Sequence, residues 1–173
     1  MRIRWVAFLC VIAAVSHAQP QPNVAAQRDA MKKLEFLVGK WSGEAAGVRG
    51  PGASFKVLQS EDVQYKLDGL VLLVEGTGRD PGSGNVLFRA LATISYDDAA
   101  SKYQFRAYND GRYLDTELKV LEKGFEWGFQ ANPVTVKYTM RLNEKGEWVE
   151  TGETTFAGAP PRKTLEMTLR KQK

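Results

Sequence analysis

Two glutamates interrupt apolar alternating segments, and they are the residues best placed to do chemistry. Glu61 alternates with Gln59 and with valines, and Glu150 stands between Trp148 and Gly152 at every second position. Side chains at alternate positions of a strand share one face, so these carboxyl groups are expected to face an interior. A buried carboxylate is costly unless it is paired, hydrated or protonated, and no lysine or arginine shares that face at mid-strand. Such groups can orient a ligand or act as an acid or base.

The thiol and imidazole groups of the chain are confined to the first 18 residues. Cys10 is the only cysteine and His17 the only histidine, and both fall within 1–18, where a basic start, a short apolar run and Ser-His-Ala predict a cleaved secretory signal. The run is too short to span a bilayer. We therefore expect an exported protein, periplasmic or extracellular, mature from Gln19, with no disulfide, no metal site, no cofactor and no histidine-based nucleophile.

The charge balance excludes one class of partner. The sequence has 24 basic and 20 acidic residues, a net charge of +4. Two arginines are removed with the signal, so the mature net charge is +2. This charge is too small for the strongly basic surface that is typical of nucleic-acid-binding proteins. We expect no nucleic-acid partner, no stable membrane insertion, and a monomer or weak homodimer.

The elements that would position the glutamates follow from periodicity. Residues 19–38 form a lead and an amphipathic helix from Val24 to Val38, ending at Gly39. Turn signals about every ten residues then divide 39–173, the barrel domain, into ten strands. These strands begin near residues 40, 54, 70, 86, 101, 112, 125, 134, 147 and 162.

Pairing residues outward from each turn keeps one face apolar throughout. The expected cross-strand pairs include Leu72 with Ala92, Glu75 with Arg89, Arg106 with Asp115, Leu118 with Phe129, and Trp127 with Tyr138. The fold class predicted is all-β, a ten-stranded antiparallel up-and-down barrel of calycin-like type with one N-terminal helix. A two-sheet sandwich is the alternative. Small inward residues favour a ligand-sized cavity over a solid core.

The inward face supplies a candidate ligand site. Gln59, Glu61 and Glu150 would make the polar contacts, and the walls would be Phe88, Tyr103, Phe105, Trp127, Phe129, Tyr138 and Trp148. Without an inward base, the small apolar ligand is expected to be neutral or cationic. Catalysis of isomerase, lyase or hydrolase type by Glu61 or Glu150 ranks lower, because their strands lie three steps, about 14 Å, apart. The glutamates could also simply bond tyrosines and trapped water.

An interaction scaffold is a third possibility. Val71, Leu73, Leu87 and Leu91 form an outer apolar patch, which a partner or the N-terminal helix would cover. The helix could instead close the barrel mouth.

The run Phe36–Glu44, with Gly39 and Trp41 at the start of the first strand, resembles the calycin superfamily of lipocalins and fatty-acid-binding proteins. With Leu70–Gly76, Ile94–Asp97, Asp110–Tyr113 and Leu165–Leu169, the chain resembles bacterial exported lipocalin-like proteins of a domain-of-unknown-function family. The resemblance implies that Gly39 and Trp41 are structural, with Trp41 plugging the closed end under Arg170 or Arg162.

The chain departs from typical lipocalins in having ten strands and no middle motif. Nitrobindin-type ten-stranded barrels, to which the resemblance is distant, bind haem through a histidine. The mature chain has none, so haem does not carry over, and ligation by a tyrosine or Met167 is the weaker alternative.

Overall fold

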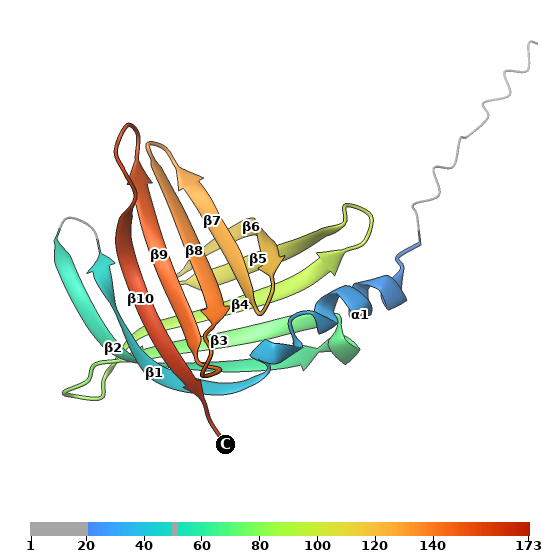
Figure 1. Cartoon of the computed structure of the whole chain (residues 1–173), viewed down its shortest axis with the longest axis horizontal. Helices are drawn as coiled ribbons and strands as arrows, with labels where there is room; N and C mark the ends of the chain where they lie inside the picture. The colour runs from blue at the N-terminus through green and yellow to red at the C-terminus, as the bar shows by residue number, and fades with distance from the viewer. Residues whose placement is uncertain (1–20, 50–51) are drawn as a thin grey trace, which may run out of the picture.

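The computed structural model describes residues 21–49 and 52–173 and contains one closed antiparallel barrel. Its order around the barrel is β1-β10-β9-β8-β7-β6-β5-β4-β3-β2, so each strand neighbours its sequence neighbours and the last strand pairs with the first (Figure 1). The elements are α1 (Val24–Lys32), β1 (Gly39–Arg49), β2 (Ala53–Lys66), β3 (Val71–Arg79), β4 (Val86–Asp97), β5 (Lys102–Asn109), β6 (Arg112–Leu121), β7 (Gly124–Ala131), β8 (Val134–Leu142), β9 (Trp148–Phe156) and β10 (Arg162–Lys171). This closure confirms the barrel and excludes the sandwich. The expected signal segment, 1–18, lies outside the described residues.

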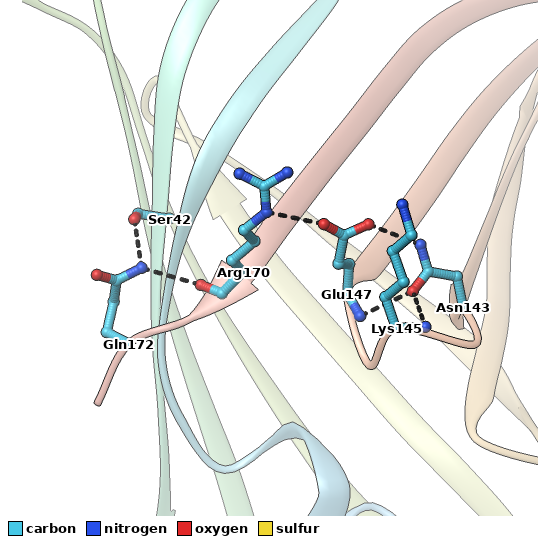
Figure 2. A network of polar contacts seen from close by, with 6 residues as sticks. All are labelled: Ser42, Asn143, Lys145, Glu147, Arg170 and Gln172. Carbon is cyan, nitrogen blue, oxygen red and sulfur yellow. Dashed lines mark hydrogen bonds and ion pairs between the residues drawn. The ribbon is translucent and has the colours of Figure 1, made fainter.

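Polar side chains reinforce the seam between the first and last strands. Arg170 on β10 donates to Glu147 at 2.8 Å, and Gln172 donates to Ser42 on β1 at 2.7 Å (Figure 2). Asn143 and Glu147 also bond each other across the β8–β9 turn, at 2.8 Å. Side-chain hydrogen bonds thereby join the end of β10 both to β1 and to the β8–β9 turn.

The N-terminal helix is shorter than expected and closes one end of the barrel. It ends at Lys32, and a separate 3-10 turn (Glu35–Leu37) leads into β1, where Gly39 has a φ of +126°. The hydroxyl groups of Tyr103 and Tyr65 donate to two carbonyls of its last turn, at 2.8 and 2.7 Å, which fixes where the helix stops.

Figure 1 shows α1 crossing beside the β2–β3 and β4–β5 turns, and Gln27 donates to Asp98 there at 2.6 Å. We call the end of the barrel that contains these turns the helix end. Of the two positions considered for the helix, closing the barrel is the one found, so α1 does not cover the outer apolar patch.

The best packed part of the core also lies at the helix end. Its fully buried side chains are Met31, Leu34, Leu37, Trp41, Val63, Leu72, Ile94, Leu118, Met140 and Leu169. Inward side chains nearer the opposite, far end of the barrel are only half-buried, among them Phe55, Ala90, Leu114, Phe129, Val136 and Thr154. Packing is therefore tight at one end and looser at the other.

Most expected registers are confirmed, including Trp127 with Tyr138 and Arg106 with Asp115. The β3–β4 hairpin is shifted by two residues relative to the expected pairs. Leu72 faces Ile94, and Glu75 faces Leu91, because the loop after β3 closes with a backbone pair between Asp80 and Asn85 and a bulge follows Gly78. A shift of two keeps every side chain on its expected face.

The β6–β7 pairing is the other correction. Only Lys119–Leu121 pairs with Gly124–Glu126, so Leu118 does not face Phe129. Beyond that short ladder the two strands diverge (Figure 1), and the Thr116 hydroxyl bridges them by donating to the Gly128 carbonyl at 2.7 Å. Within the described residues, no helix is long and apolar enough to cross a membrane.

Candidate functional site

Glu150 on β9 is buried and held by two indole groups. Trp148 Nε1 donates to its carboxylate at 3.0 Å, and the Trp127 side chain also hydrogen-bonds to it. Its cross-strand neighbours are Met140 and Met167, both buried. Burial raises the pKa of Glu150 to about 7, and the indole hydrogen bonds oppose that rise because they favour the ionised form.

Glu61 on β2 lies over a glycine, Gly76, which is its partner on β3. Gln59 Nε2 donates to its carboxylate at 2.8 Å. A Cβ at Gly76 would lie 2.9 Å from both carboxylate oxygens, so the absent side chain makes room for the acid. Gly78 makes room for Gln59 in the same way, at 2.9 Å. Burial raises the pKa of Glu61 to about 8, the Gln59 hydrogen bond lowers it, and the charge of Glu150 raises it further.

The two acids face the lumen without a cation. β1 and β10 separate their strands, as expected, yet each carboxyl group is close enough for Glu150 to affect Glu61 electrostatically. None of the ion pairs among the described residues includes either of them; the pairs lie on the outer face or at turns and the helix. With pKa values near neutrality, both groups exchange protons in the physiological range.

An aromatic wall stands beside Glu150. The Trp127 and Tyr138 rings stack with centroids 4.3 Å apart, and Phe105 packs on Trp127 at 4.7 Å. Trp127 and Tyr138 are half-buried although they face inward, so their surfaces remain accessible within the barrel. Phe88 and Phe129 are also half-buried and pair with Gly78 and Val136.

Three of the residues expected to line or support the site lie nearer the helix end: Tyr103, Trp41 and Trp148. Tyr103 packs edge-to-face on Tyr96 at 4.9 Å, and its hydroxyl is engaged by α1, which gives it a structural role. Trp41 is buried, donates to the Leu37 carbonyl at 2.7 Å, and packs edge-to-face on Trp148 at 5.7 Å. The basic residue over Trp41 is Lys171, 5.3 Å from the ring centroid, and not Arg170, which turns outward to Glu147.

Arg162 is the other residue implied for that position, and it lies elsewhere. It begins β10 at the far end and pairs with Thr154. Lys171, the last residue of β10, therefore lies over the Trp41 ring, and neither arginine does.

Sequence reasoning missed how some of these residues act. Trp127 and Trp148 were expected only as walls, although Trp148 precedes Glu150 by two positions and so shares its face. Gly78 and half-buried Phe55 were not among the expected site residues, and alternation with Val57 and Gln59 is the signal that places Phe55 inward. In the part of the chain that the structure describes, no three histidine, cysteine, aspartate or glutamate side chains gather as a metal site.

Comparison with known proteins identifies the fold. No protein-family model matches the sequence, and no curated protein sequence matches it. The crystal structure of Rv2717c from M. tuberculosis is similar, with a TM-score of 0.63 and 16% sequence identity, over 83% of this chain and 98% of that chain. At this identity the similarity shows a shared fold. The molecule is thus a closed ten-stranded antiparallel barrel with a solved structural neighbour.

Proposed function

We propose that the protein is a calycin-like carrier that binds a small, largely apolar molecule in its lumen without transforming it. The observation that carries the proposal is a pair of inward glutamates, Glu61 and Glu150, beside accessible aromatic rings. Neither glutamate belongs to an ion pair among the described residues. Small-molecule sites are typically apolar with a few placed polar groups.

The polarity of the lumen selects the ligand's head group. A fatty-acid carboxylate would approach two acids and no base, so it would be repelled or would remain unpaired. A neutral donor can bond either carboxyl group, and an ammonium group can pair with the ionised form. The stacked Trp127 and Tyr138 rings add an electron-rich wall that favours cations.

The discriminating experiment compares three ligands with one chain length. Dodecylamine, dodecanol and dodecanoate are titrated into the purified protein at pH 7.5, with tryptophan fluorescence as the signal. We expect the amine and the alcohol to bind at least about tenfold more tightly than the acid. Glu61→Gln and Glu150→Gln should weaken the amine selectively, and the exposed outer variant Glu75→Gln should not. Tightest binding of dodecanoate, unchanged in both lumen variants, would contradict the proposal.

The natural ligand requires a second measurement. Native mass spectrometry of the exported protein should find a co-purified small molecule that is neutral or basic. An interior with no ligand bound, and no affinity for any of the three probes, would leave only the scaffold interpretation.

Catalysis is the second candidate, and one observation favours it. The pKa values of about 8 for Glu61 and about 7 for Glu150 are near the optimum for an acid or base working at neutral pH. Turnover of a bound ligand that is lost in Glu150→Gln while binding is retained would place catalysis above simple binding.

A further inference from the structure

A groove on the outer face of β3 to β6 is not explained by the lumen. It has a volume of about 540 Å³ and lies beside the β5–β6 turn. Leu91, Tyr108 and Tyr113 form one row across it, since Leu91 pairs with Tyr108 and Tyr108 pairs with Tyr113. Tyr113 is 69% exposed and Tyr108 43% exposed, with ring centroids 6.3 Å apart. An exposed aromatic row beside a hollow is the kind of surface that meets a partner.

The charges of this groove are balanced and unpaired. Glu75 and Arg89 line one side, and Asp110 and Arg112 line the other at the β5–β6 turn. None of the four belongs to an ion pair in the described chain, whereas neighbouring Arg106 is paired with Asp115. All the basic residues lining the groove are arginines, the type enriched at protein interfaces, and none is a lysine.

This balance favours a second copy of the chain over other occupants. A lipid surface or an acidic peptide would need a net positive groove, and a basic peptide a net negative one. A groove with two charges of each sign has no net preference for either. A two-fold axis that passes between Glu75 on β3 and Arg89 on β4, however, places Arg89 of each copy opposite Glu75 of the other, and the same contact is then made twice.

We infer that this groove is the interface of a two-fold symmetric homodimer. Tyr113 of each copy enters the partner's groove above Leu91 and Tyr108, and Arg89 of each copy pairs with Glu75 of the other. The interface lies outside the barrel wall, so it is independent of ligand binding in the lumen.

Sedimentation velocity of the purified protein between 1 and 100 µM tests the inference. A concentration-dependent dimer is expected, and Tyr113→Ser should weaken it at least about tenfold. Phe156→Ser is the matched control, because Phe156 is a 48% exposed aromatic at the end of β9, outside the groove. Circular dichroism checks that each variant remains folded. A protein that is monomeric throughout this range would overturn the inference, as would a dimer that Tyr113→Ser leaves unchanged.

Charge reversal tests the pairing itself. Arg89→Glu creates two Glu–Glu contacts in a homodimer, and Glu75→Arg creates two Arg–Arg contacts, so each variant alone should dimerise at least about tenfold more weakly. In a dimer of one variant with the other, each contact again joins an acid to an arginine. One contact has the native residues and the other has the two charges exchanged. The mixture should therefore form heterodimers within about threefold of the wild-type affinity. Weakened single variants whose mixture fails to associate would overturn the inference.

Discussion

The lumen glutamates make the stability of the barrel fall as the pH rises. Their pKa values are raised by folding, to about 8 for Glu61 and about 7 for Glu150, from an ordinary value of 4.5. Between pH 4.5 and 8 the folded state therefore holds protons that the unfolded state has released. By linkage, the free energy of unfolding is highest below pH 4.5 as far as these groups are concerned, and it is lost as the pH passes through the folded pKa values.

The size of the effect follows from the same values. Each pH unit between the unfolded and folded pKa is worth about 1.4 kcal/mol. Ionising both groups in the folded protein therefore costs on the order of 5 kcal/mol at Glu61 and about 3 kcal/mol at Glu150. Domains of this size unfold with about 5–15 kcal/mol, so the loss is a large share of the total.

Urea denaturation at pH 5, 7 and 9 measures this dependence. The wild type should lose several kcal/mol between pH 5 and pH 9. Glu61→Gln replaces the protonated acid with a neutral amide of the same shape, so it should match the wild type at pH 5 and exceed it at pH 9. Glu150→Gln should act likewise over a lower range, up to about pH 7. The exposed Glu153→Gln variant, on the outer face of the same strand as Glu150, should keep the wild-type slope. An equal slope in wild type and in the Glu61→Gln, Glu150→Gln double variant would refute the reasoning.

Three further expectations test the fold and its processing. Gly76→Ala places a methyl group against the Glu61 carboxylate and should destabilise the barrel by about 1–3 kcal/mol in urea denaturation, whereas Gly82→Ala in the β3–β4 turn should be near neutral. Tyr103→Phe removes a hydrogen bond to the last turn of α1 and should lower the free energy of unfolding by about 1 kcal/mol, with faster amide exchange confined to α1. The intact mass of the protein, if it is exported as expected, should equal that of a chain that begins at Gln19. A mass that includes residues 1–18 or an attached lipid would contradict the expected cleavage and export.

The strand pattern was predictable because alternation does not depend on loop geometry. Faces were assigned correctly even where register was not: Leu72 faces Ile94 instead of Ala92, a shift that leaves both side chains inward. The shift itself comes from the bulge after Gly78, which no local signal in the sequence reveals. The short β6–β7 ladder was equally hidden, because its divergence depends on how the whole barrel closes.

The helix shows the opposite limit. Its apolar spacing predicted a single element to Val38, but the tyrosine hydroxyls that bond its last turn come from β2 and β5, far away in the sequence. Such tertiary contacts decide where a short helix ends, and periodicity carries no record of them. The site divides in the same way: alternation placed Glu61 and Glu150 inward, whereas the indole donors to Glu150 appear only in the assembled barrel.

Trp148 joins the two halves of the molecule. One edge of its ring packs on Trp41 in the tightly packed helix end, while its indole N–H bonds Glu150 in the lumen. The fully buried side chains at the helix end contribute apolar burial that stabilises the fold, whereas the remainder of the interior contains two acids and half-buried rings. A ligand that bonds Glu150 would therefore act on a group already held in place by the core. The proposed binding site therefore combines polar groups and accessible rings with a well-packed core beside it.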